Sequence, residues 1–129
     1  LYNFPKNKFV ANFIGDANVV MAEIINKKSD IYELKLGEMI VNIESQRDLN
    51  GSVSVALRPE KINISKEKNS NSILAKVNNA SFVGSNYQYI FNSTLGKLYV
   101  VSGDTNNVFK VNEEVCLTID AEEIKILED

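Results

Sequence analysis

The stretch VSVALRPEKINI at residues 53–64 decides the fold, because VCLTIDAEEIKI at residues 115–126 repeats its pattern 62 positions later. Both stretches alternate apolar and other residues, cross a polar step of four residues, and then resume the alternation shifted by one. A strand has a period of two, so this shift requires a bend or bulge that re-aims the buried face. Pro59 explains the first bend, because it cannot donate to a sheet ladder and restricts the residue before it. The sequence therefore predicts a duplicated β-unit.

Strand and turn signals continue through most of the chain. The polar stretch 65–72 joins two halves, at about 18–65 and 73–129, and Gly37 and Gly96 mark a tight turn in each half. This pattern is typical of a small, closed or nearly closed all-β architecture, a barrel or a sandwich. The predicted strands cover residues 19–27, 31–36, 38–44, 52–58, 61–65, 73–83, 86–94, 97–102, 114–120 and 123–127.

Residues 5–15 contain the one helix that the sequence predicts. An apolar stripe follows helical spacing and Gly15 can end the helix in a left-handed cap. A helix of this length is marginally stable alone, so it must pack against something. One alternative is that it packs on its own barrel, and the other is that residues 1–17 are a connector from a preceding domain. The chain begins with Leu1 in place of Met, which favours the connector, and we expect it to be cut from a longer polypeptide.

Composition narrows the possible functions. The net charge of −3 and the pI near 5.0 argue against a nucleic-acid surface, which needs clustered Lys and Arg. No apolar run approaches the roughly 20 residues that span a bilayer. The single cysteine, Cys116, excludes an internal disulfide and suits a reducing compartment. The chain has no histidine, the commonest metal ligand and general base, so we expect no metal, no cofactor and no catalytic residue here.

Two motifs resemble a known family. The opening LYNFPKNKFVANFIG at residues 1–15, with Ala17 and Asn18 after it, is similar to the segment that leaves the nucleotide-binding domain of bacterial ABC importer ATPases. The Arg58-Pro59-Glu60 phrase looks like one at a strand end of their C-terminal TOBE domain, the transport-associated OB fold. The resemblance covers essentially the whole chain. It implies an OB-like β-fold at 18–129, preceded by one short helix.

The resemblance also implies a function. The chain would be a non-catalytic regulatory and dimerisation domain. It would belong to the ATP-binding subunit of an ABC importer for a solute such as spermidine, putrescine or ferric iron. It contains no phosphate-binding loop, so the resemblance implies that ATP and Mg would bind in a nucleotide-binding domain missing from this chain. Its partners would be a second copy of the same subunit and, through the parent ATPase, the membrane permease. The location would be cytoplasmic, peripheral at the inner face of the membrane without direct insertion, and the apolar surface for dimer contact should lie on one half-barrel.

Two groups of residues are candidate sites. Arg58 and Glu60 could reach a partner subunit, or form an exposed ion pair at a strand end. The stretch 81–89 could form a ligand loop, in which hydroxyls, an amide and backbone N–H groups bind an anion beside two tyrosines. It could equally be a hairpin bulged at Gly84 whose aromatic rings pack inside the barrel. The candidate residues of this stretch are Ser81, Ser85, Asn86, Tyr87 and Tyr89.

Two further functions remain as alternatives. A small-ligand sensor would give feedback control of transport through the 81–89 stretch, although no Lys or Arg in that stretch would neutralise an anion. A nucleic-acid-binding OB module could stack bases on Tyr87, Tyr89, Phe91 and Tyr99, but the sequence provides no basic groove around them. We therefore expect no nucleic-acid partner.

Overall fold

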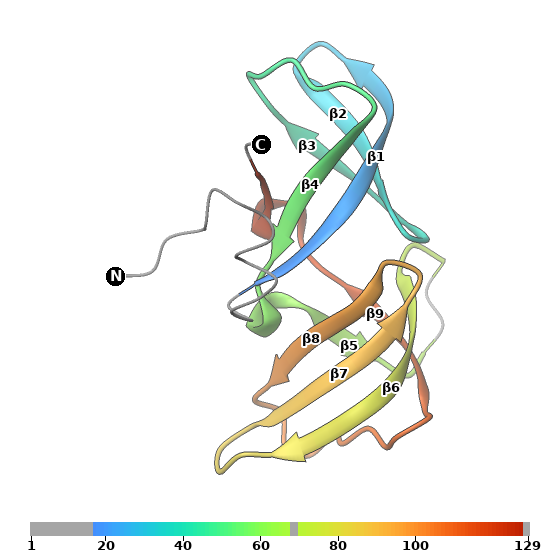
Figure 1. Cartoon of the computed structure of the whole chain (residues 1–129), viewed down its shortest axis with the longest axis vertical. Coiled ribbons are helices and arrows are strands. Elements are labelled where there is room, and N and C mark those ends of the chain that lie inside the picture. Colours follow the sequence, from blue (N-terminus) through green and yellow to red (C-terminus); the bar gives the residue numbers. More distant parts are fainter. Residues whose placement is uncertain (1–16, 68–69, 128–129) are drawn as a thin grey trace.

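The computed structural model describes residues 17–67 and 70–127, and it contains ten strands in two antiparallel sheets of five strands each (Figure 1). The helix predicted at 5–15, and nearly all of the connector predicted at 1–17, lie outside the described residues. The elements are β1 (Asn18–Lys28), β2 (Ile31–Leu36), β3 (Met39–Glu44), β4 (Ser52–Leu57), η1 (Pro59–Lys61), β5 (Asn63–Ser65), β6 (Ile73–Phe82), β7 (Tyr87–Ser93), β8 (Gly96–Ser102), β9 (Glu114–Thr118), η2 (Ala121–Glu123) and β10 (Ile124–Ile126).

The predicted all-β, OB-like class is confirmed, and each predicted strand is present. The two polar steps of the repeat form short 3₁₀ turns, η1 and η2. Each turn is closed in the same way, by Lys61 N–H donating to the Arg58 carbonyl at 3.0 Å and by Glu123 N–H donating to the Asp120 carbonyl at 2.9 Å. The strands at both steps are shorter than predicted because the turn residues leave the ladder.

The two sheets do not coincide with the two halves of the sequence. The first sheet has the order β10-β4-β1-β2-β3 and the second has the order β5-β9-β6-β7-β8. The chain therefore crosses to the other sheet at each 3₁₀ turn, so that β5 pairs with β9 and β10 pairs with β4. The shift of the buried face in the repeat reflects this crossing between sheets. Each half of the sequence contributes its last strand to the sheet that the other half forms.

The two sheets are related by a repeat of structure as well as of sequence. Their strand orders match element by element, and each has a bulge on its first long strand, between Ile24 and Asn26 in β1 and between Val77 and Asn79 in β6. The inner faces of both sheets join in one hydrophobic cluster. Its largest fully buried side chains include Tyr32 from the first sheet and Tyr89 and Phe91 from the second. One continuous core therefore holds both half-barrels together.

Two asparagines bind the edge strands across the sheet boundary. Asn18, 5% exposed, donates from Nδ2 to the Tyr99 carbonyl in β8 at 2.8 Å and to the Leu57 carbonyl at 3.2 Å, and its Oδ1 accepts from Tyr99 N–H at 2.7 Å. Asn71 makes the same pair of contacts to Ile40 in β3, at 3.0 and 2.7 Å, from an exposed position. Each amide imitates one residue of a neighbouring strand and protects an edge that would otherwise be open.

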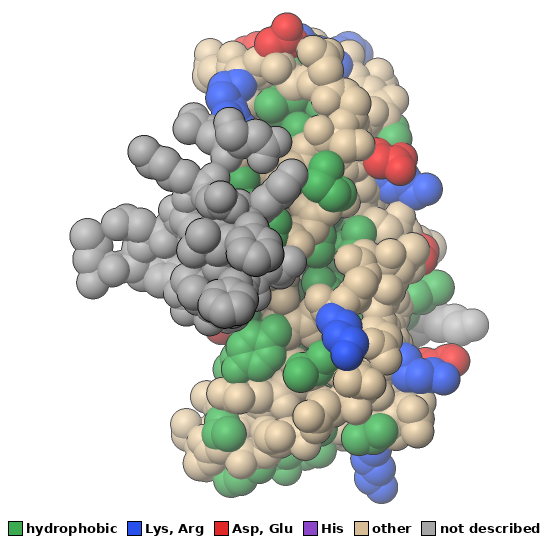
Figure 2. Space-filling view, viewed as in Figure 1, with side chains coloured by type: hydrophobic (Ala, Val, Ile, Leu, Met, Phe, Trp, Pro, Cys, Tyr) green, Lys and Arg blue, Asp and Glu red, His purple; other side chains and the backbone are tan. Residues whose placement is uncertain are grey.

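The exposed apolar side chains are spread over both sheets, which corrects the expectation that they gather on one half-barrel. On the face of the molecule that Figure 2 shows, hydrophobic side chains lie in both the upper and the lower part. In the described part of the chain, no helix is long and apolar enough to cross a membrane. The exposed large apolar residues are Met21, Ile25, Ile31 and Ile40 in the first sheet, and Leu74, Phe82, Val83 and Val111 in the second half of the chain.

Candidate functional site

An open cleft of about 540 Å³ lies where the second half-barrel fails to close. β5 and β8 are the two edge strands of the second sheet, and the cleft lies between them under the segment that follows β8. Its volume falls in the usual range for small-molecule sites. The residues that line it are Glu60, Ile62, Asn63, Ile64, Ser65, Lys66, Glu67, Val101, Ser102, Gly103, Asp104, Asn107 and Phe109.

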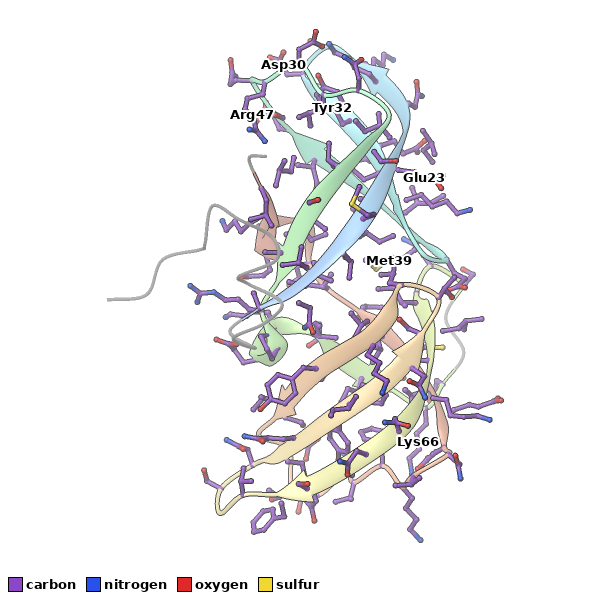
Figure 3. All side chains as sticks on the ribbon, in the orientation of Figure 1. Glu23, Asp30, Tyr32, Met39, Arg47 and Lys66 are labelled. Atoms are coloured by element: carbon purple, nitrogen blue, oxygen red, sulfur yellow. The ribbon has the colours of Figure 1, made fainter. Side chains whose placement is uncertain are left out.

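The charges of the cleft are mainly negative. Lys66, which Figure 3 places in the lower half of the molecule, lies 3.2 Å from the Glu113 carboxylate and 5.5 Å from the centre of the Phe109 ring. Its charge is thus largely balanced by a carboxylate outside the lining. The Lys110 backbone N–H, with help from Lys66, holds the pKa of Glu113 below its usual value. The Asp104 carboxylate accepts from the Asn107 side chain at 2.7 Å, which lowers the pKa of Asp104. With Glu60 and Glu67 also present, the cleft suits a cationic or neutral polar ligand better than an anion.

Of the two charged candidates at the first 3₁₀ turn, only Glu60 lines this cleft. Glu60 is exposed, within η1. Arg58 precedes η1 and is half-buried, with an extended backbone. η1 packs against β8. The turn thus closes one end of the cleft, and contact of Arg58 and Glu60 with a partner subunit stays a prediction.

The stretch 81–89 forms the end of the β6–β7 hairpin. Val83 N–H donates to the Asn86 carbonyl at 2.9 Å, and Gly84 provides the positive φ of +85° that the turn requires. Ser81 and Ser85 are exposed, and Asn86 is half-buried with its Oδ1 atom buried and unpaired in the described structure. The register irregularity lies further back, between Val77 and Asn79.

The two tyrosines of this stretch differ in exposure. Their rings are 5.9 Å apart and belong to a row that runs from Phe82 through Tyr87 and Tyr89 to Phe91. Tyr89 is fully buried, its hydroxyl accepts from Phe109 N–H at 3.2 Å, and burial raises the pKa of this hydroxyl. Tyr87 is half-buried, in the first position of β7. The structure therefore brings both tyrosines together on one face, and Tyr89 supports the cleft indirectly through Phe109.

Sequence reasoning did not identify most of the cleft, because its walls come from separate stretches at 60–67 and 101–109 that meet only through the strand exchange. It also missed the two edge-binding asparagines, although Asn18 was noted for its family resemblance. Among the described residues, no group of three or more Cys, Asp or Glu side chains is placed to hold a metal ion.

Two five-stranded antiparallel sheets around one core define a small all-β domain of the OB-like class. The chain belongs to the TOBE domain family, whose model matches residues 55–127, more than half of its length.

Several relatives are similar to the chain over most of its length. The Fe(3+) ions import ATP-binding protein FbpC of Agrobacterium fabrum is 27% identical over 117 residues, which cover 91% of this chain and 33% of the relative. The spermidine/putrescine import ATP-binding protein PotA of Acetivibrio thermocellus is 31% identical over 127 residues, which cover 98% of this chain and 34% of the relative. The chain thus spans about a third of the length of these relatives.

A solved structure shares the fold. The cytoplasmic molybdate-binding protein ModG, with molybdate bound, superposes with a TM-score of 0.68 over 87% of this chain and 96% of that chain. The sequences are only 10% identical, so this likeness shows the fold alone.

Proposed function

We propose that this chain is the regulatory and dimer-supporting C-terminal domain of the ATP-binding subunit of an ABC importer. The observation that carries the proposal is the match of nearly the whole chain to about a third of importer ATP-binding proteins such as FbpC and PotA. The names of these relatives favour ferric iron, spermidine or putrescine as the imported solute. ATP and Mg would bind in the remaining part of such a subunit, and this domain would carry no catalytic residue.

The physical role is that of a rigid body beside a moving one. A single core spans both sheets, and Asn18 and Asn71 tie the edge strand of each sheet to the other. Such a body can keep two subunits in contact while their nucleotide-binding domains open and close. The assembly would lie at the inner face of the membrane, under the permease, with no insertion of this domain into the bilayer.

Removal of the domain tests the proposal. In the intact subunit, deletion of residues 16–129 should lower the dimer fraction in sedimentation velocity and weaken the control of ATP hydrolysis by the permease. Basal hydrolysis should persist, because the chain contains no phosphate-binding loop. A truncated subunit with the same dimer fraction and the same control of hydrolysis would show that the proposal is wrong.

The cleft between β5 and β8 favours a second candidate function, a small-ligand sensor that adjusts transport. Its size suits one small molecule, and its carboxylates favour a cation. Calorimetry with spermidine, a ferric complex and molybdate should detect heat with a cationic ligand, and Glu60→Gln should weaken that binding. Absence of heat and of any rise in melting temperature with all three would contradict the sensor.

A further inference from the structure

The β6–β7 hairpin leaves part of a strand edge open. β9 pairs with β6 only along Ile73–Lys76, and the next residue, Val77, donates to the Glu113 carbonyl at 2.9 Å and accepts from Asn112 N–H at 2.8 Å. Beyond that point β6 pairs only with β7, up to Phe82 opposite Tyr87. Figure 1 shows these two strands continuing together to their turn. In the described part of the chain, no strand lies along the outer side of residues 79–82.

The backbone groups of this edge point outward at alternate residues. Because Val83 N–H donates to the Asn86 carbonyl, Val83 and Asn86 form a hydrogen-bonded pair, and the pairs of β6 with β7 alternate from there. The N–H and C=O groups of Ser81 therefore face β7, whereas those of Ala80 and Phe82 face away from it. A neighbouring strand could pair with these outward groups.

The equivalent edge in the first sheet contains charged side chains that protect it from pairing with another strand, and an edge without them is called unguarded below. β1 also runs past its neighbour β4, whose pairing ends at Glu23, and its free part contains Lys27 and Lys28. Lysines on a free edge oppose pairing with another strand. The free part of β6 contains Asn, Ala, Ser and Phe, and the sequence has no charged residue from 77 to 96. Of two edges related by the internal repeat, only the one on β6 is unguarded.

The end of the same hairpin has the composition of an interface. Phe82 is 54% exposed and Val83 is 46% exposed, and the Phe82 ring lies 5.0 Å from the half-buried Tyr87 ring. The Asn86 Oδ1 atom is buried without a hydrogen-bond partner in the described structure. Interface centres are depleted in charge and enriched in aromatic side chains, as this surface is.

We propose that the β6 edge at residues 79–82 pairs antiparallel with the same edge of a second copy of this chain. A twofold axis at Ser81 would place Ser81 opposite its own copy, and Ala80 opposite Phe82 of the other copy. That register joins the outward backbone groups in about four hydrogen bonds. The small Ser81 side chains permit close approach, and each Phe82 ring covers the Ala80 methyl group of the other copy on the same face.

A second copy fits this edge because the edge is self-complementary about Ser81, where the outward groups of Ala80 meet those of Phe82. Each chain has a net charge of −3, so two copies meet with least repulsion through a surface that contains no charged residue. The inference deepens the dimer-supporting role proposed above and rests on it only in requiring two copies. The contact is small beside the roughly 1,200 Å² of a stable interface, so the isolated chain should dimerise weakly.

Cysteine cross-linking tests the register. In Ser81→Cys the two Cβ atoms would face each other about 4.5–5.5 Å apart, close to the disulfide range, so mild oxidation should produce a linked dimer. Asn92→Cys is the matched control, since Asn92 is exposed on β7, which is paired on both sides. The unsubstituted chain controls for Cys116, which is buried. Linkage no greater for Ser81→Cys than for Asn92→Cys would overturn the proposal.

Charge substitution gives an independent measurement. Ser81→Lys would set two like charges opposite each other and raise the dimer dissociation constant at least about tenfold in sedimentation equilibrium, whereas Asn92→Lys should leave it unchanged. Equal effects of the two lysines would refute the pairing. If Ser81→Cys links the chain while deletion of residues 16–129 changes neither dimerisation nor ATP hydrolysis in the subunit, the edge contact stands and the importer role fails. If Ser81→Cys does not link the chain while the deletion lowers dimerisation and changes the control of ATP hydrolysis, the importer role stands and the edge contact is wrong.

Discussion

Replacement of Asn18 by alanine should destabilise the fold more than any exposed polar substitution in the chain. The amide makes three hydrogen bonds that join β1, β4 and the edge strand β8, at 3.2, 2.8 and 2.7 Å. Asn18 is only 5% exposed, so water cannot readily replace these contacts. Alanine removes all three and leaves both backbone groups of Tyr99 without this partner.

The magnitude follows from the burial of these groups. A net contribution of about 1 kcal/mol for each hydrogen bond sets an upper value near 3 kcal/mol, and partial access of water to the half-buried Tyr99 reduces it to about 2–3 kcal/mol. For a domain of this size, such a loss lowers the melting temperature by about 10 °C.

Urea unfolding monitored by circular dichroism measures the effect, and Asn71→Ala is its matched control. Asn71 makes the same two contacts with the backbone of Ile40 but is exposed, so water replaces most of what alanine removes and the cost should be about 0.5–1 kcal/mol. An Asn71→Ala variant as unstable as Asn18→Ala would refute the reasoning that burial sets the strength of these bonds.

Three further substitutions test particular contacts. Tyr89→Phe removes the acceptor for Phe109 N–H and should cost about 1–2 kcal/mol in urea unfolding; an unchanged midpoint would contradict this hydrogen bond. Gly37 has a φ of +61°, so Gly37→Ala should cost about 1–2 kcal/mol, whereas Gly103→Ala, with open space around its Cβ, should stay within about 0.5 kcal/mol. Glu38 accepts from the Thr94 hydroxyl and from Leu74 N–H, and these bonds hold its pKa below the ordinary 4.5. Its contribution to stability is therefore complete above the unfolded-state pKa and is lost as pH falls through the lower folded-state pKa. The stability difference between wild type and Glu38→Gln should be constant above about pH 5 and shrink towards pH 3, by a small amount because Glu38 is exposed; a difference that grew on acidification would disprove it.

The sequence predicted the strands well because their signal is local. Alternation along 53–64 and 115–126 marks both strands and the polar step between them, and Gly37 and Gly96 mark the turns. The exchange of β5 and β10 could not be predicted in this way. Alternation shows which side chains share a face, but it does not show which sheet receives a strand after a turn.

The candidate sites also differ in whether their sequence signal is local or depends on long-range contacts. The hairpin end at 81–89 was located from local turn residues, and the structure places a tight turn there. The buried position of Tyr89 depends on the contact with Phe109, which is distant in sequence. The cleft depends on β5 lying beside β9, a long-range pairing without a local pattern.

A comparison of the two halves shows where the second departs from the first. In the first half Ile24 and its cross-strand partner Leu34 are 10 positions apart, and the corresponding Val77 and Phe91 are 14 positions apart. The β6–β7 hairpin is therefore four residues longer than its counterpart, and those residues make the free edge of β6 longer than that of β1.

The second difference between the halves lies in the connection that leads to β4 in the first half and to β9 in the second. From Met39 to Val53 is 14 positions, and from the corresponding Gly96 to Val115 is 19 positions. The five additional residues belong to the part of the chain that includes the 101–109 wall of the cleft. Because the first half forms the same sheet without either insertion, the fold does not require them. The unguarded edge and the cleft are thus the parts of this domain that are available for contact with other molecules.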